Sequence, residues 1–212
     1  AATGAVLQNV LGASKPKFSV APPSAPPWSK RALARTLHLI NCHGGPADPQ
    51  FYGEDESGDQ PVSYESSDLA SKIPRGAVAA AECCYGAELY DPGKKGLPGI
   101  ANVYLAEGAA GYLGSTTIAY GADSSDISDA DILCELFLKL VFGGATLGRA
   151  LLQARQMYIK RCAPLSQTEY KTLAQFLLLG DPSQRPVVPK GEAVVASGKA
   201  AAGHAKHRKF LV

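Results

Sequence analysis

Two short motifs contain the residues best suited to chemistry: a histidine in NCHGG at residues 41–45, and two adjacent cysteines in ECCYG at residues 82–86. A cysteine attacks as its thiolate, yet a free thiol has a pKa of about 8.5 and is mostly protonated at neutral pH. A neighbouring imidazole can accept that proton and later return one to a leaving group. We therefore predict His43 as a general base and Cys83 as a nucleophile of one site.

Each motif directly follows an apolar run that predicts a buried strand, at residues 36–40 and 77–81. The second run contains only small apolar residues, which is typical of a strand buried on both faces. Open α/β sheets place their ligand sites at the carboxyl ends of parallel strands. If the two strands are neighbours, His43 and Cys83 face one crevice although 40 residues separate them in the sequence.

The remaining pattern alternates strands and helices, which predicts an α/β fold with a mostly parallel sheet flanked by helices. Residues 44–64 are rich in Gly, Pro and Asp and predict a long loop. A third strand is expected at residues 111–119. Helices are expected at residues 67–73, 98–107, 129–142, 146–160 and 166–179, the last beginning with a capping box of Ser166 and Glu169.

Composition divides the chain into three parts. Residues 1–35 are rich in Ala and Pro and predict a linker or pro-segment. Residues 36–183 hold both motifs and form the expected catalytic domain. Residues 184–212 predict a basic, low-complexity tail.

Charge and cysteine content bear on the partners of the protein and on its cellular location. The formal net charge is only +2, so no global field favours nucleic acid or a membrane surface as a partner. No apolar run approaches the roughly 18 residues that predict a membrane span. Five cysteines, two of them adjacent, make a poor disulfide framework and favour a reducing compartment such as the cytoplasm. A secreted or periplasmic location stays open if the chain, which starts at Ala1, is a processed fragment.

An acyl-transfer site also needs donors for the oxyanion of its tetrahedral intermediate. Gly44 follows the histidine directly and has no side chain to obstruct a substrate, so its N–H and that of Cys83 are the candidate oxyanion hole. Cys84 is the competing nucleophile. A different interpretation makes Cys42, His43 and the two adjacent cysteines the ligands of a zinc ion.

The two motifs resemble those of the clan CD cysteine peptidases, which include gingipains, clostripain, caspases, legumain and separase. In that clan one apolar strand ends in His-Gly and another ends in the cysteine nucleophile. The likeness is greatest to the gingipain family and extends to GYLGST at residues 111–116, ATLGRA at 145–150 and LLGDPS at 178–183. Cys83 matches the family's Cys-x-x-Gly pattern, because Gly86 stands three residues after it.

This resemblance implies a caspase-like three-layer sandwich. It also implies a peptidase that forms a thioester with a protein or peptide substrate and requires no cofactor. Members that cleave after Arg or Lys suggest a basic P1 residue, for which the candidate binding residues are Glu54, Asp55, Asp123 and Asp126. With Asp129, the last two are also candidates for a structural Ca²⁺ site.

The sequence departs from the family ahead of the histidine strand. The family fold has further strands there, which in some members supply an acidic residue that orients the histidine. Only about 35 linker-like residues precede the strand here. We therefore expect an N-terminal region or a partner chain to complete the sheet. An inactive relative that serves as a scaffold is the alternative function.

Overall fold

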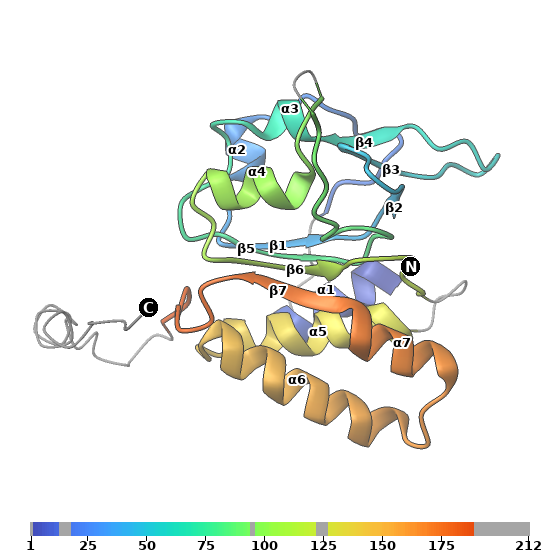
Figure 1. Cartoon of the computed structure of the whole chain (residues 1–212), viewed down its shortest axis with the longest axis vertical. Coiled ribbons are helices and arrows are strands. Elements are labelled where there is room, and N and C mark those ends of the chain that lie inside the picture. The colour runs from blue at the N-terminus through green and yellow to red at the C-terminus, as the bar shows by residue number, and fades with distance from the viewer. Residues whose placement is uncertain (1, 13–17, 94–95, 122–126, 189–212) are drawn as a thin grey trace, which may run out of the picture.

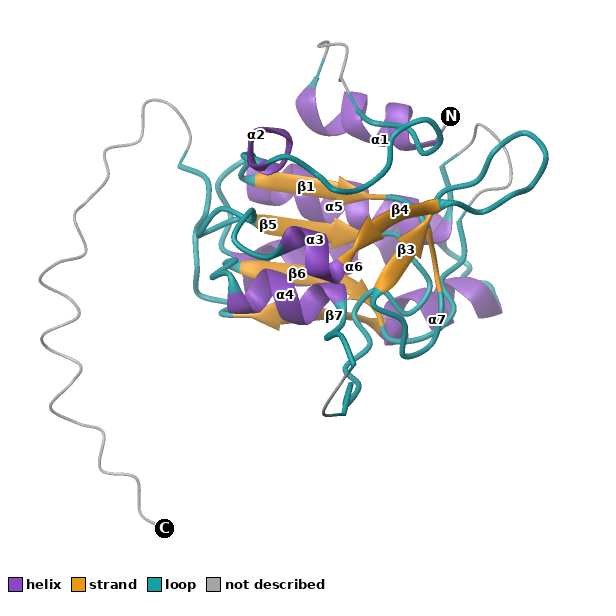
Figure 2. Ribbon diagram, turned by 90° about the horizontal axis from the view of Figure 1, so that it is seen from above, coloured by secondary structure: helices purple, strands orange, loops and turns teal. Residues whose placement is uncertain are grey.

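The computed structural model describes residues 2–12, 18–93, 96–121 and 127–188. Its centre is a four-stranded sheet in the order β1-β5-β6-β7, whose strands lie side by side in Figure 2. β1 (Leu37–Ile40), β5 (Val78–Ala81) and β6 (Gly111–Ser115) are parallel, and β7 (Phe176–Gly180) runs antiparallel to β6. The predicted α/β class with a mostly parallel sheet is confirmed.

Helices cover both faces of this sheet and make three layers (Figure 1). One face carries α1 (Ala2–Leu11), α5 (Asp129–Phe142), α6 (Leu147–Cys162) and α7 (Gln167–Gln175). The other carries α2 (Lys30–Leu33), α3 (Ser66–Leu69) and α4 (Ile100–Ala106). Alternate residues of β5 enter the hydrophobic core on each face, which explains why the strand has no polar residue.

The predicted loop over residues 44–64 instead contains most of a second, antiparallel sheet. Its strands are β2 (His43–Gly44), β3 (Gln50–Tyr52) and β4 (Val62–Glu65), in the order β2-β3-β4. The prediction missed them because strands of two to four residues within Gly- and Pro-rich sequence show no measurable periodicity. Phe51 and Tyr64 pack with the core on the α3–α4 face, and that packing selects the strand conformation.

The helix predicted over residues 166–179 ends at Gln175, and the chain continues as β7. The capping box of Ser166 and Glu169 is present at its start. Residues 176–179 (FLLL) suit a helix or a strand equally well by periodicity. Pairing with β6, in the register Ser115↔Phe176, decides for the strand.

Residues 1–35, which we predict as a linker or pro-segment, begin with α1, and this helix packs against α5. Figure 2 shows α1 beside the β1 edge of the sheet. Val6 and Val10 are one turn apart and both buried in the core that α5 and α6 share. Residues 2–11 are therefore part of the folded domain.

Among the described residues, β1 and β7 form the two edges of the main sheet. The expectation that further chain pairs along β1 stays a prediction. No helix in the described part of the chain combines the length and apolarity needed to cross a bilayer.

His38 lies inside β1 and is held by three buried contacts. Its Nε2 lies 2.9 Å from the carbonyl of Arg35 and 3.1 Å from that of Leu33, so this nitrogen carries the proton and donates it. Its Nδ1 therefore accepts from the hydroxyl of Tyr104, 2.7 Å away. Burial lowers the pKa of His38 below 6.5. The imidazole is thus a neutral structural group that fixes the start of the strand.

Replacing Val6 with alanine tests whether α1 belongs to the domain. We expect a loss of about 1–3 kcal/mol in the free energy of unfolding, because the smaller side chain leaves a void against α5. The exposed neighbour Gln8, replaced with alanine, should change stability by no more than about 0.5 kcal/mol. Urea denaturation followed by circular dichroism measures both. Equal stability of Val6→Ala and wild type would mean that residues 2–11 are a linker and do not belong to the folded domain.

His38 predicts a component of the pH dependence of stability. Because burial lowers the pKa of His38 in the folded chain, the unfolded chain binds more protons at this histidine than the folded chain does as the pH falls through 6.5. The free energy of unfolding should therefore fall as the pH decreases, by up to about 1.4 kcal/mol per pH unit. Denaturation between pH 7.5 and 5.5 should show a shallower slope for His38→Gln than for wild type. Identical slopes would contradict a buried neutral His38.

Candidate active site

The register between β1 and β5 brings the two motifs together at one edge of the sheet. Ile40 pairs with Ala81 at the last rung, and the amide of Glu82 then donates to the carbonyl of Ile40 at 2.7 Å. The side-chain amide of Asn41 donates to the Glu82 carboxyl at 2.7 Å and so links the two residues that directly follow the strands. Cys42 and Cys83 therefore follow as neighbours, and His43 and Cys84 lie just beyond them.

The backbone of Gly44 lies directly against Cys84. A Cβ atom added at Gly44 would stand only 2.2 Å from the carbonyl oxygen of Cys84. That oxygen belongs to the backbone and cannot move aside as a side chain would, so only glycine fits at this position. The His-Gly motif is thereby placed in contact with the second cysteine of the pair.

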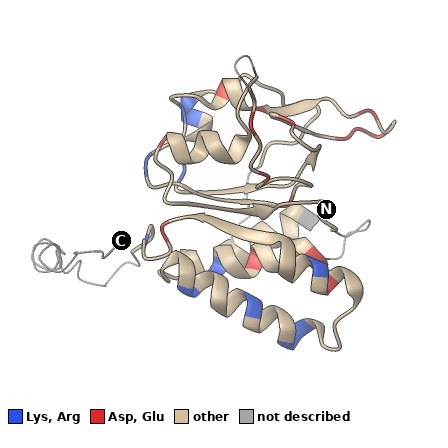
Figure 3. Cartoon of the chain, in the orientation of Figure 1, with Lys and Arg blue, Asp and Glu red and all other residues tan. Residues whose placement is uncertain are grey.

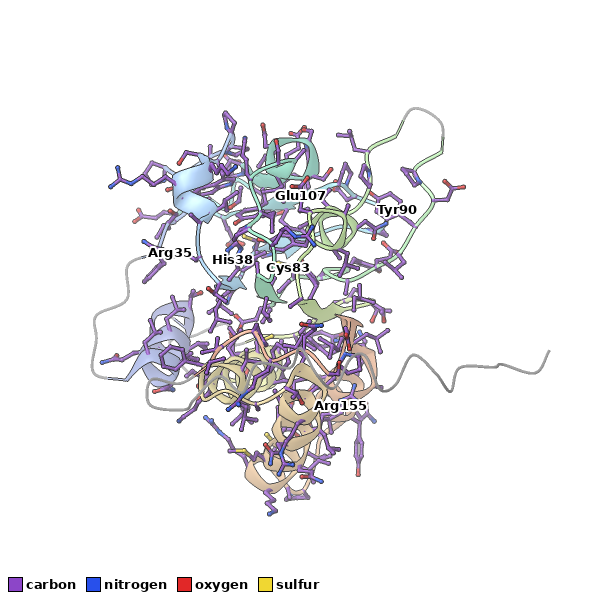
Figure 4. The ribbon with its side chains drawn as sticks, turned by 90° about the vertical axis from the view of Figure 1, so that its left-hand side faces the viewer. Arg35, His38, Cys83, Tyr90, Glu107 and Arg155 are labelled. Atoms are coloured by element: carbon purple, nitrogen blue, oxygen red, sulfur yellow. The ribbon has the colours of Figure 1, made fainter. Side chains whose placement is uncertain are left out.

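Cys83, the predicted nucleophile, has no exposure to solvent. Its side chain continues the row of Ala79 and Ala81 into the core on the α3–α4 face, because alternate residues of an extended chain share a face. Figure 4 shows it in the interior of the molecule. Burial, and next a hydrogen bond with the Cys42 thiol, raise the pKa of Cys83 well above its ordinary value. This environment argues against a thiolate at Cys83.

Cys84 points the other way and is partly exposed. Its thiol donates to the carbonyl of Ala119 at 3.5 Å, in the segment that follows β6. Of the two adjacent cysteines, only Cys84 therefore offers its sulfur to a ligand at the surface. Counting from Gly86 selects Cys83 in the sequence, but the full burial of Cys83 and the partial exposure of Cys84, in the turn after β5, favour the competing assignment.

His43 is half-exposed and has one strong partner. Its Nε2 lies 2.6 Å from a carboxylate oxygen of Glu54, and the exposed fractions of the two side chains are 49% and 51%. Glu54 lies beyond β3 on the hairpin that follows the histidine. The sequence predicts Glu54 as a substrate-binding residue, and nothing in the sequence indicates a contact with His43.

The thiol of Cys42 fills the space between the histidine motif and the core. It donates to the hydroxyl of Ser63 on β4 at 3.6 Å and also contacts Cys83. The hydrogen bond with Cys83 lowers the pKa of Cys42 more than burial raises it. The partly buried Cys42 and the fully buried Cys83 thus form a pair of hydrogen-bonded thiols.

A buried acid ties the two strand ends together on the α5 face. Glu82 accepts from Asn41 through one oxygen, while its other oxygen has no hydrogen-bond donor among the described residues. Burial, followed by the negative charge of Asp131, raises the pKa of Glu82 well above its ordinary value. The Glu82 carboxyl is thus held neutral, and we assign it a structural role.

The predicted substrate-binding acids have different surroundings. Asp55 accepts from the amides of Ser57 and Asp59 and from the Ser57 hydroxyl, so its carboxylate organises the turn of the hairpin. These bonds, that with the Ser57 hydroxyl first, lower its pKa. Asp123 and Asp126 lie outside the described residues. Figure 3 shows acidic residues along the hairpin between β3 and β4.

The zinc interpretation fails on geometry. The His43 ring is directed at Glu54, the Cys84 thiol at Ala119, and the Cys83 thiol into the core, so the proposed ligands do not converge. Within the described ranges, no three or more His, Cys, Asp or Glu residues are arranged to hold a metal ion. The predicted Ca²⁺ site depends on Asp123 and Asp126 and stays a prediction.

Comparison with known proteins identifies one family. The model of peptidase family C25 matches residues 44–187, beginning directly after His43. A solved structure named "Structure of Protease" aligns with a TM-score of 0.36 and 16% identity, covering 70% of this chain and 35% of that one. The chain thus spans about a third of the length of that structure. No curated protein matches.

Alkylation of the folded protein tests the placement of the thiols. Iodoacetamide should modify Cys84 and leave Cys83 and Cys134 intact, because both are fully buried and burial raises the pKa of both thiols. Peptide mass spectrometry identifies the modified residues. The protein unfolded in guanidinium chloride, in which all five cysteines should react, is the control. Modification of native Cys83 ahead of Cys84 would reverse the assignment.

Proposed function

Because the chain belongs to peptidase family C25, a family of cysteine peptidases, we propose that it hydrolyses peptide bonds with Cys84 as nucleophile and His43 as general base. Family membership supports the reaction class. The contact between Gly44 and the backbone of Cys84 carries the choice of residues, because it joins the histidine motif to the one thiol of the pair that reaches the surface.

The first step forms a thioester. His43 accepts the proton of the Cys84 thiol as the sulfur attacks the carbonyl carbon of the scissile bond. The tetrahedral intermediate then collapses, the C–N bond breaks, and the amine leaves with the proton that His43 returns. Water attacks the thioester next, giving its proton to His43. Breaking the C–S bond releases the acid product, and the proton returns to Cys84.

The proposed oxyanion hole contains the amide of Gly44, as the sequence predicts, but its second donor differs from the predicted one. We predicted the amides of Gly44 and Cys83 together with a nucleophile at Cys83. With the nucleophile at Cys84, the amide of Cys84 itself takes that place, because the donor must lie on the side of the carbonyl that the sulfur attacks. The missing side chain of Gly44 leaves its N–H accessible to the developing negative charge.

A substrate with a basic side chain is the proposed preference. The hairpin from Glu54 to Asp59 has four acidic residues and no basic one, and it begins at the partner of His43. A field of one sign near a site attracts ligands of the opposite charge. Since Glu54 and Asp55 already have partners within the protein, this attraction is proposed as a property of the whole hairpin.

Peptidyl reporters test the nucleophile. With Arg, Lys and Asp at P1, we expect cleavage after Arg or Lys in preference to Asp. Cys84→Ala should lower kcat/KM by at least about 10³-fold, because the acyl-enzyme cannot form. Cys83→Ala is the matched control and should retain activity within about tenfold, since its sulfur only fills the core. A peptidyl chloromethyl ketone should modify Cys84, as mapped by mass spectrometry.

The opposite results distinguish the alternatives. Modification of Cys83, with loss of turnover only in Cys83→Ala, would restore the sequence-based assignment. A folded protein that gives neither an adduct nor turnover would favour an inactive scaffold. A preference for Asp over Arg and Lys would overturn the proposed role of the acidic hairpin.

A further inference from the structure

The carboxylate of Glu54 holds the histidine of the proposed dyad at one nitrogen. The distance from Oε2 of Glu54 to Nε2 of His43 is 2.6 Å, a short hydrogen bond of the kind that a carboxylate accepts from an imidazole N–H. With Nε2 engaged, Nδ1 is the nitrogen left to exchange a proton with a thiol. The contact therefore fixes both the orientation of the ring and the nitrogen available for catalysis.

The backbone of the hairpin determines where Glu54 lies. His43 pairs with Tyr52 across the β2–β3 ladder, and Glu54 follows two residues later. A residue two positions from the direct partner lies on the same side of the ladder, within diagonal reach of a long side chain. The pairing that makes the small sheet thus also brings the carboxylate to the imidazole.

Gly53 anchors the chain immediately before Glu54. Its amide donates to the carbonyl of Pro61 at 2.9 Å, and an added Cβ would lie 2.0 Å from the carbonyl oxygen of Ala21. Gly53 is itself buried, enclosed by the segment at Ala21 and by the opposite arm of the hairpin. Glu54 therefore extends from a fixed backbone although its own side chain is half-exposed.

Stability alone does not account for this contact. A pair between two half-exposed side chains contributes at most about 1 kcal/mol to folding and is screened by salt. For catalysis the same contact has two larger consequences. It limits the rotation of the imidazole, and it stabilises the imidazolium that forms when the thiol loses its proton.

We infer that Glu54 is a positioning residue that orients His43 toward Cys84, the role that a carboxylate serves in a three-residue catalytic constellation. This inference rests on the proposed function and replaces the substrate-binding role predicted for Glu54. Its carboxylate comes from the hairpin after the histidine, so the described residues already contain an acid that orients the base.

Steady-state kinetics separates positioning from substrate binding. Glu54→Gln should lower kcat by about 10- to 100-fold for Arg, Lys and Asp reporters alike, with KM changed less than about threefold. Glu54→Asp, which keeps the charge, should recover part of the lost kcat. Glu107→Gln removes a negative charge at the end of α4, outside the hairpin, and should leave kcat unchanged. A rise in KM confined to Arg and Lys reporters would overturn the inference in favour of substrate binding.

A second measurement does not depend on turnover. The rate at which iodoacetamide alkylates Cys84 should fall about tenfold or more in Glu54→Gln, because a misplaced imidazole no longer assists formation of the thiolate. An unchanged rate would overturn the positioning role. If the wild type turns over substrate and Glu54→Gln has the same kcat, only this inference is rejected. Wild type without turnover and without reaction at Cys84 would reject the proposed function as well.

Discussion

The parallel ladder between β1 and β5 is the constraint on which the candidate site depends. Its last rung, Ile40 with Ala81, sets the register in which both chains leave the sheet. The bond from the Glu82 amide to the Ile40 carbonyl extends that register beyond the strands, and the Asn41–Glu82 contact links the residues that directly follow them. The backbone alone therefore places His43 and Cys84, which are 41 residues apart in the sequence, at one edge of the sheet.

The same ladder determines the different surroundings of the adjacent cysteines. Cys83 joins Ala79 and Ala81 in the core on the α3–α4 face, whereas Cys84 lies in the turn that follows β5 and is partly exposed. A buried thiol behaves as a small apolar group, whereas a partly exposed thiol can be reached by a reactant. One residue type thus serves packing at position 83, and at position 84 it is the nucleophile that we propose.

The small sheet links the histidine to the acidic hairpin. β2 consists only of His43 and Gly44, and its pairing with β3 keeps the imidazole within reach of Glu54. Packing of Phe51 and Tyr64 on the core holds this sheet in place. Two glycines permit the close approaches involved, Gly44 against Cys84 and Gly53 against Ala21. The hairpin is therefore a structural part of the site as well as a source of negative charge.

The sequence by itself determined the α/β class, the three parallel strands and helix α5, because apolar runs and helix caps are local patterns. It also determined the family, through its short motifs. Tertiary structure decided the rest. Residues 2–11 became a helix against α5, residues 176–180 became a strand beside β6, and short strands formed within a Gly- and Pro-rich stretch. It also buried Cys83, left Cys84 partly exposed and joined Glu54 to His43. Side-chain direction and contacts between distant segments depend on strand register, which local sequence patterns do not contain.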